Sequence, residues 1–494
     1  MTDNIDINAK LFPPPEYQNV VKNPLAPRTW PGVTPDSTKT LQAILTDNHK
    51  RWHVFFNDRG FHNHSAHTAL SLWCLGAGKS ILQSSYEASA KYQRPAFTSP
   101  NSITKQNWVN HLGHESNYYQ GYLEFFQDEL EHKNFSAILE EYVFATDANF
   151  VSGRSADKQP EMLNRFFAGL LHPMIHAGFG IEFNLPGTFA EGLAQTAVHP
   201  ADSTDVLPAT FFSQSEDGLV SRFASTVGLG SQTDKKDVHA FTVLARILAD
   251  PTLVLNAPPQ ELGFYQKVIA KHGESIVKYV NQWTLDGDLQ KKLEELLWTN
   301  VLIYAVAGNE PTGPFNADFF HMHFVTSSIF LSTIFVHLKR SSQILLLKSY
   351  FSVCLGWYLS RGRPPLDIAR FFSKTETLLP VAPGPQPTPN EAAHPSPSSI
   401  HAITPDPWLP VIQSTLTHPD DHISKLQRAL SEYASHFGST PAGTFAGTEL
   451  KDAELIDGTL FVRAAGLTQS RLGWVREGEA PLEGVWDRHG FFKA

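Results

Sequence analysis

The sequence predicts a mainly α-helical protein, a large multi-helix and bundle-like domain that carries a small β-hairpin near its C-terminus. Apolar residues recur every three or four positions between residues 40 and 379, as in "YYQGYLEFFQDELEHKNFSAILEEYVF", and this spacing is typical of packed helices. Alternation of apolar and polar residues, which indicates half-buried strands, is rare in the same region. The 494 residues are 41% hydrophobic, which suffices for one large core or two closely packed ones.

The first three segments of the chain follow from these patterns. Residues 1–39 are expected to form an N-terminal extension, and residues 40–379 the helical core. Residues 380–408 are rich in proline. Because proline cannot donate a backbone hydrogen bond, we expect an insertion or loop there.

Residues 409–494 are expected to complete the same core. The stretch "THPDDHISKLQRALSEYASHFG" resumes helical spacing, with Pro419 and Asp420 in its first turn and Gly438 at its end, as helix start and stop preferences require. The later stretch "GTLFVRAAGLTQSRLGWV" contains runs of β-type residues broken by glycine. This second pattern predicts the hairpin.

Composition excludes several classes of protein. The net charge is −10 and no run of lysine or arginine occurs, so nucleic acid is not an expected partner. No stretch stays apolar for the roughly 18 residues that a membrane span needs, and the N-terminus lacks a signal-peptide pattern. The two cysteines, Cys74 and Cys354, lie in apolar segments, so we expect no disulfide framework and a reducing, cytoplasmic setting.

The chain contains 22 histidines, and histidine is the commonest metal ligand in proteins. In "GFHNHSAHTALSLWCLGAGKS" His64 and His67 are three residues apart, which places them on one face of a helix, while His62 lies near the expected helix start. The spacing suits two metal ligands. It equally suits histidines that only cap or solvate a helix end.

Three further blocks place histidines in apolar surroundings. In "LLHPMIHAGFGIEF" His172 and His176 are four residues apart across a proline, and they suit either ligation or hydrogen bonding within the core. In "DFFHMHFVTSSIFL" His323 continues the apolar face of the helix, whereas His321 points to another side. In "HPDDHISKLQRAL" His422 and Lys425 share a face, although Lys425 could simply pair with Asp421.

Rival motifs are incomplete. "LGAGKS" has Trp73 where a phosphate-binding loop needs its first glycine. "VGLGSQ" lacks the third glycine and the acidic residue of a dinucleotide site, and no Gly-x-Ser-x-Gly elbow occurs. Two imitators of a 2-His-1-carboxylate site remain, His272-Gly-Glu274 and His418-Pro-Asp420; the first lies in a polar stretch that indicates a solvated face.

Together the blocks "GFHNHSAHTALSLWCLGA", "LHPMIHAGFGIEF" with "AEGLAQTAVH", "ADFFHMHFVTSSIFL" and "PDDHISKLQRAL" resemble, in order and spacing, those of the questin oxidase-like family. The resemblance runs from about Trp52 to Asp487. It implies an oxidoreductase of polyketide pathways. One relative that cleaves an anthraquinone ring is described as a non-heme iron dioxygenase whose metal is held by four histidines and a carboxylated lysine.

Carried over block by block, the resemblance implies which residues form the site. His62 and His172 would act beside the metal as catalytic groups or replace a ligand, and Lys348 is the alternative to the carboxylated lysine chosen here. The implied metal ligands are His64, His67, His176, His323, His422 and Lys425.

The chemistry of these groups is consistent with iron. Imidazole suits Fe(II), but four neutral imidazoles leave its charge uncompensated in a low-dielectric pocket. A buried lysine has a lowered pKa, so its neutral amine can add CO₂ and supply the missing anion as a carbamate. Aromatic residues in or beside the blocks could receive a flat substrate, although aromatics at helical spacing are usually core. They are Trp73, Phe179, Phe319, Phe320 and Phe324.

We therefore expect an oxygenase that uses Fe(II) and O₂ on an aromatic polyketide of the anthraquinone or xanthone type. The reaction would be oxidative C–C cleavage or Baeyer–Villiger-type oxygen insertion. One alternative is a Baeyer–Villiger oxidase that uses NADPH and no metal. The other is a helical accessory protein without catalysis, in which the histidines are structural.

Overall fold

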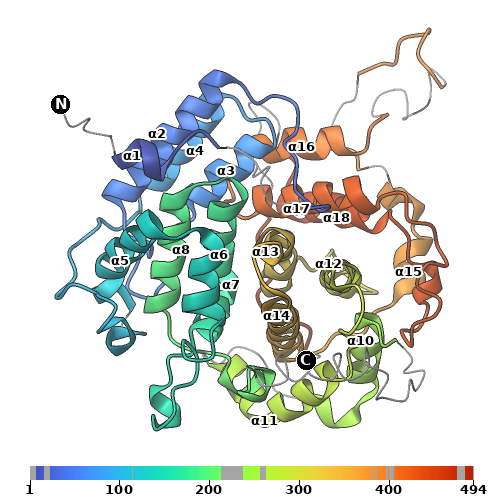
Figure 1. Ribbon diagram of the computed structural model, residues 1–494. Coiled ribbons are helices and arrows are strands. Elements are labelled where there is room, and N and C mark those ends of the chain that lie inside the picture. The colour runs from blue at the N-terminus through green and yellow to red at the C-terminus, as the bar shows by residue number, and fades with distance from the viewer. Residues whose placement is uncertain are drawn as a thin grey trace.

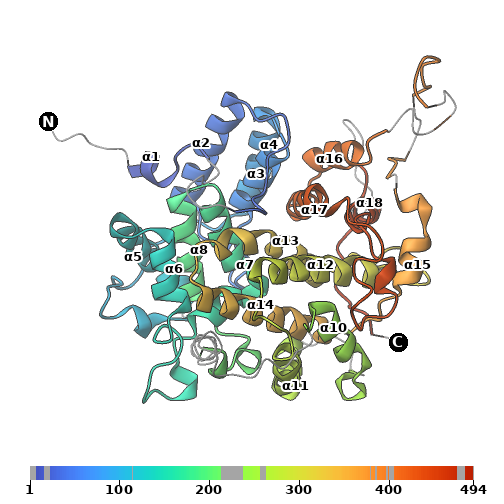
Figure 2. The same ribbon diagram turned by 45° about the vertical axis from the view of Figure 1, so that its right-hand side comes forward.

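The computed structural model describes residues 7–15, 23–113, 115–212, 237–255, 263–378, 380–383, 387–395, 399, 405–475 and 484–492. Helices account for almost all of its regular structure (Figures 1 and 2). Within those ranges the backbone forms only isolated β-bridges, which join Trp52 to Pro95, Phe55 to His62 and Asp318 to Asp487. The prediction of a mainly helical fold is confirmed.

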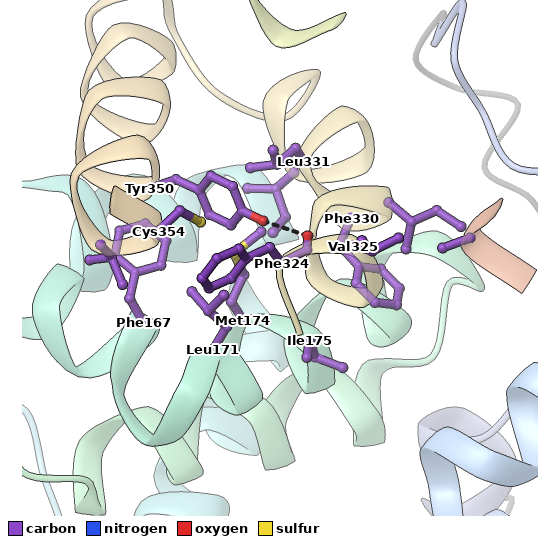
Figure 3. Close-up of a cluster of buried hydrophobic side chains, with 14 of the residues drawn as sticks. Phe167, Leu171, Met174, Ile175, Phe324, Val325, Phe330, Leu331, Tyr350 and Cys354 are labelled. Atoms are coloured by element: carbon purple, nitrogen blue, oxygen red, sulfur yellow. Dashed lines mark hydrogen bonds between the residues drawn. The ribbon is translucent and has the colours of Figure 1, made fainter. Parts of the chain in front are cut away.

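The centre of the molecule is a layer of long, buried helices. Helix α7 (Met162–Glu182) packs along α8 (Pro186–Val198), and α5 (Tyr119–His132) covers α8 on its other side. Helix α13 (Phe319–Phe335) packs on α7 and is followed by α14 (Arg340–Ser360). Figure 3 shows how side chains of α7, α13 and α14 pack against one another, among them Phe167, Leu171, Met174, Phe324, Phe330 and Tyr350.

The buried hydroxyl of Tyr350 in this core has hydrogen-bond partners. The Tyr350 hydroxyl lies 2.9 Å from the Phe324 carbonyl and 2.8 Å from Ser327 Oγ, so burial of this phenol costs little free energy.

Other helices surround this layer. They are α1 (Ile7–Leu11), α2 (Pro35–Arg51), α4 (Lys79–Ala90), α6 (Phe135–Leu139), α10 (Ala240–Ala249), α11 (Phe264–Val280), α12 (Leu289–Gly308), α15 (Ile368–Ser373) and α16 (Trp408–Thr417).

Four helices form a closed ring that positions the site. Helix α3 (Ser65–Cys74) packs on α7, α7 on α13, α13 on α17 (Ile423–Phe437), and α17 back on α3. The helices come from distant parts of the sequence, as their colours in Figure 1 show. Each of the four histidine blocks of the sequence belongs to one helix of this ring.

The prediction of a C-terminal β-hairpin is wrong. Residues 458–475 contain helix α18 (Leu460–Leu472), which packs on α12 and α17. Its buried residues Leu460, Phe461, Ala464, Ala465 and Leu472 recur at three- and four-residue spacing, so the stretch has one apolar helical face. Phe461 belongs to that face, and its burial with the other residues of the face outweighs the strand preference of the stretch.

The proline-rich segment lies partly outside the described residues, which exclude 384–386, 396–398 and 400–404. In its described part no helix precedes α16, which begins at Trp408. None of the described helices combines the length and the apolar character that crossing a membrane would take.

Candidate metal centre

Two pairs of histidines connect α3 to α7. His64 is the N-cap residue of α3, and its Nε2 lies 2.8 Å from Nε2 of His172. His67, one turn further, has its Nε2 2.9 Å from Nδ1 of His176. The spacings of three residues on α3 and four on α7 therefore match, and the pairs lie one helical turn apart.

His323 of α13 and His422, the N-cap residue of α17, lie beside the first pair. The ring centroids are 5.0 Å apart for His172 and His323, 5.3 Å for His323 and His422, and 4.6 Å for His64 and His422. One ring nitrogen from each of His172, His323 and His422 lies within 4.8 Å of the other two. We call His64, His172, His323 and His422 the four-histidine cluster; each helix of the ring supplies one member.

Two members of the cluster have their Nδ1 bound to the backbone. Nδ1 of His172 is 2.6 Å from the carbonyl oxygen of Gly169, and Nδ1 of His323 is 2.7 Å from that of Phe319. A carbonyl oxygen only accepts, so both rings carry a proton on Nδ1.

The other two members share one carboxylate. Asp421 Oδ2 is 2.8 Å from Nδ1 of His64, and Asp421 Oδ1 is 2.7 Å from Nδ1 of His422. Burial alone would raise the pKa of Asp421, but its interactions with His422 and His64 outweigh burial and hold the pKa well below its usual range. Asp421 is thus an anion, and it fixes two imidazoles with their Nδ1 protonated.

All four Nε2 atoms are consequently left with lone pairs when the rings are neutral. Burial lowers the pKa of His64 to about 4 and the pKa values of His172 and His323 well below their ordinary value. Two of the lone pairs, on His64 and His172, face each other, and Nε2 of His323 and of His422 is buried without a hydrogen-bond partner. Such an atom costs ~1–3 kcal/mol, and a cation bound by all four would remove the cost.

Lys425 adds a fifth group to the cluster. It lies in the first turn of α17 and is buried. Burial lowers the pKa of its ammonium to about 8, against the opposing effect of Asp421 and Asp420. After burial, the charge of Lys425 is among the causes that lower the pKa values of His64, His172 and His323, which places the amine among these rings.

An unusual backbone turn orients His172. Within α7, Gly169, Leu170 and Leu171 have φ values of 51°, 61° and 70°, a left-handed turn that costs ~1–2 kcal/mol for each leucine. The turn brings the Gly169 carbonyl onto Nδ1 of His172. Strain of this kind is retained where surrounding structure enforces it and is concentrated at functional sites.

The second histidine pair, His67 and His176, is connected to Glu191 of α8. Nε2 of His176 is 2.8 Å from Glu191 Oε2, and Glu191 Oε1 is 2.6 Å from Nδ1 of His49. Burial would raise the pKa of Glu191, but hydrogen bonds from His176 and His49 lower it to about 2. Among the described residues, no group of close ligand atoms includes His67 or His176, so their role as ligands stays a prediction.

His62 lies between His172, one member of the first pair, and His199. Its ring stacks on His172 with centroids 3.9 Å apart, and its Nε2 is 2.7 Å from Nε2 of His199. One ring nitrogen of His62 also lies within 4.8 Å of those of His64 and His172. The structure thus brings His62 and His172 into the site, and their catalytic role stays a prediction.

Sequence reasoning missed three groups at the site. It treated Asp421 only as a partner for Lys425, although the motif "PDDH" places a carboxylate beside His422. It quoted "AEGLAQTAVH" without assigning Glu191 or His199, whose neighbours become visible only in the folded chain. The alternative lysine, Lys348, donates to Asn281 Oδ1 at 3.1 Å.

Comparison with known proteins shows which family the chain is similar to. The family model described as questin oxidase-like matches residues 61–430. The Baeyer-Villiger oxidase ptaJ of Pestalotiopsis fici is 29% identical over 67% of this chain and 71% of its own. The Baeyer-Villiger oxidase notM of an Aspergillus species is 27% identical over 88% of this chain and 87% of its own. The oxidoreductase AflY of Aspergillus parasiticus is 25% identical over 60% and 57%.

The matched residues contain every member of the four-histidine cluster together with Asp421 and Lys425. The family match spans most of the chain, and the relatives are named as oxidases, monooxygenases or oxidoreductases. The chain belongs to the questin oxidase-like family and is an oxidoreductase.

Proposed function

We propose that this protein is an Fe(II)- and O₂-dependent oxygenase that acts on an aromatic polyketide of the anthraquinone or xanthone type. The reaction is Baeyer–Villiger-type oxygen insertion or oxidative cleavage of a C–C bond. The observation that carries the proposal is a group of buried histidines in which one ring nitrogen from each of His172, His323 and His422 lies within 4.8 Å of the other two. Nε2 of His323 and Nε2 of His422 have no hydrogen-bond partner, and Nε2 of His64 lies 2.8 Å from Nε2 of His172.

The residues fit an iron ion by the chemistry of their donors. Each ring of the four-histidine cluster donates Nδ1–H to a carboxylate or a carbonyl, which is the usual arrangement behind metal-bound histidine. Neutral imidazole suits Fe(II). Bound there, Fe(II) would supply the one-electron chemistry that a reaction with O₂ needs.

Lys425 would balance the charge of the ion. Its amine is buried, and the low pKa leaves part of it neutral near pH 8. The ammonium first loses one proton, and the neutral amine then adds CO₂ and releases a second proton as the carbamate forms. The residue thereby changes from a cation to an anion beside the cluster. Without this change an ammonium group would repel the ion.

Aromatic rings border the cluster where a flat substrate would lie. The Phe319 ring is 4.7 Å from the ring of His323 and 5.0 Å from that of His422. The relatives named Baeyer-Villiger oxidases support oxygen insertion as the reaction class.

Two measurements test the proposal: the iron content of the protein, and O₂ uptake followed with an oxygen electrode. The purified protein is expected to bind about one iron per chain after anaerobic loading with Fe(II) and to consume O₂ when 1,8-dihydroxyanthraquinone is added. O₂ uptake that needs NADPH and persists in chelator-treated, iron-free protein would overturn it in favour of the metal-free oxidase. Zinc binding without O₂ uptake would overturn it in favour of the accessory protein.

A further inference from the structure

The residues of the four-histidine cluster and their neighbours differ in their exposure to solvent. His323 is 1% exposed and the neighbouring His67 is fully buried, whereas His64 and His422 are 8% and 7% exposed. The side chain of Asp421, which joins these last two, is 31% exposed. Of these groups Asp421 is the most exposed to solvent, and we call its side of the cluster the Asp421 edge.

Two exposed aromatic rings lie next to the segment that carries His62. Among the large hydrophobic residues that the described chain exposes, Phe61 at 52% and Tyr92 at 49% are the two aromatic ones. Both pack on Phe56, with ring centroids 6.0 and 5.4 Å apart. Exposed apolar side chains that lie together, rather than singly, are a feature of binding surfaces.

The backbone ties Phe61 to the cluster. Phe55 and His62 form an antiparallel bridge, and Phe56 N–H donates to the Phe61 carbonyl at 2.8 Å. Consecutive side chains of an extended segment point to opposite faces. His62 therefore lies inside, stacked on His172, while its neighbour Phe61 lies outside.

Tyr92 is tied to the same place by serines. Tyr92 N–H donates to the Ser89 carbonyl at 3.3 Å, and Ser89 Oγ lies 2.6 Å from the Oγ of Ser65, the residue after His64. Burial of part of the ring raises the pKa of Tyr92, and the charges of Asp421 and Asp420 add to this effect. The ring thus lies within electrostatic reach of the edge.

A C-terminal strap, residues 484–492, reaches the cluster beside His422 through Trp486. Trp486 Nε1 donates to Asp420 Oδ1 at 3.0 Å, and its ring lies 6.3 Å from that of His422. Asp487 anchors the strap, because Arg471 binds both of its carboxylate oxygens and the Ala317 N–H donates to one of them.

We propose that Phe61 and Tyr92, which lie next to the segment of His62, and Trp486, which lies next to His422, form the docking site through which a planar, fused-ring aromatic molecule reaches the four-histidine cluster. The inference rests on the proposed function for the reaction that follows, but binding can be measured without it. Flat rings stack on aromatic side chains with little loss of rotamer freedom, which is why a rim of this composition selects them.

Equilibrium dialysis against 1,8-dihydroxyanthraquinone tests the docking site. The double variant Phe61→Ala/Tyr92→Ala is expected to raise the dissociation constant about tenfold, as the loss of two stacking contacts implies. Tyr92→Phe keeps the ring without its hydroxyl and should bind as the unaltered protein does. Val254→Ala/Leu409→Ala removes two side chains that are each 50% exposed elsewhere and should also leave binding unchanged.

Iron content and the unfolding midpoint are measured on every variant. Unchanged binding by Phe61→Ala/Tyr92→Ala, or equal weakening by the Val254→Ala/Leu409→Ala control, would overturn the docking site. Because the dialysis is done on iron-free protein as well, binding that follows the expected pattern supports the docking site even if the unaltered protein holds no iron. Absence of iron would refute the proposed function alone.

Discussion

Nε2 of His64 and Nε2 of His172 lie 2.8 Å apart although neither ring has a proton left to place between them. Asp421 holds the Nδ1 proton of the first ring, and the Gly169 carbonyl holds that of the second. Two neutral imidazoles would repel in this arrangement. A shared cation makes it favourable, and several of the predictions below follow from that requirement.

Substitution of His323 by glutamine should abolish stoichiometric iron binding. Nδ1 of His323 is fixed by Phe319 and its Nε2 has no partner, so its role is to present one lone pair. His321→Gln is the matched control, since His321 is buried on the same helix, two residues away, and packs on Phe491 instead. Iron per chain is measured by mass spectrometry; equal loss in both variants would contradict the assignment.

Asp421→Asn should weaken iron binding about 10- to 100-fold, the usual effect of removing a group that orients metal ligands. An amide has one accepting oxygen, so it cannot accept from both His64 and His422, as the carboxylate does. Competition with a chelator of known affinity gives the dissociation constant. A value unchanged by the substitution would show that the carboxylate does not orient these rings.

Lys425→Ala should lower iron loading, and added propionate should restore part of it by supplying a carboxylate in the vacated space. In the unaltered protein, loading at constant dissolved CO₂ should rise as the pH passes about 8, the pKa of Lys425, because only the neutral amine forms a carbamate. Lys348→Ala should have no effect, since Lys348 bonds Asn281. Loss of iron in Lys348→Ala would reverse the choice between the two lysines.

Glu191→Gln should change how stability depends on pH. The pKa of Glu191 is about 2 in the folded protein against an ordinary value of 4.5, so the carboxylate stabilises the fold above pH 4.5 and loses this effect as the pH falls toward 2. The difference amounts to at most ~3 kcal/mol. Urea unfolding between pH 6 and 3 should show a shallower decline for the variant, and parallel curves would contradict the linkage.

Gly169→Ala should destabilise the protein more than Gly60→Ala. Both glycines have positive φ, 51° and 72°, so either substitution costs about 1 kcal/mol in backbone strain. A methyl group on Gly169 would also lie 2.6 Å from His199 and 2.9 Å from His62, whereas nothing lies within 4 Å at Gly60. Thermal unfolding measures the difference, and equal midpoints would contradict the close packing.

The sequence predicted the helical class and the four histidine blocks because both depend on local spacing. It could not assign partners across the fold. His64 and His67 look equivalent on one helix face, yet the first joins the four-histidine cluster and the second bonds His176. The difference arises from Glu191 on α8, which holds His176 and is visible only in three dimensions.

The conformation of residues 458–475 was predicted wrongly for a related reason. Val462 and Phe461 favour strands locally, but the burial of one helical face against α12 and α17 decides the conformation. The left-handed turn before His172 was equally beyond prediction, since two of its three residues are leucines, which avoid positive φ in short peptides. Packing of Leu171 in the core, where it is fully buried, enforces that turn.

The ring of α3, α7, α13 and α17 also bears on biosynthesis. Its first histidine is residue 64 and its last is residue 422, so a ribosome must complete most of the polypeptide before the last imidazole can meet the others. An ion at the proposed centre would therefore be acquired only after most of the chain has been synthesised. A nascent chain that stalls before α17 would carry His64, His172 and His323 but neither His422 nor the Asp421 carboxylate that joins His422 to His64.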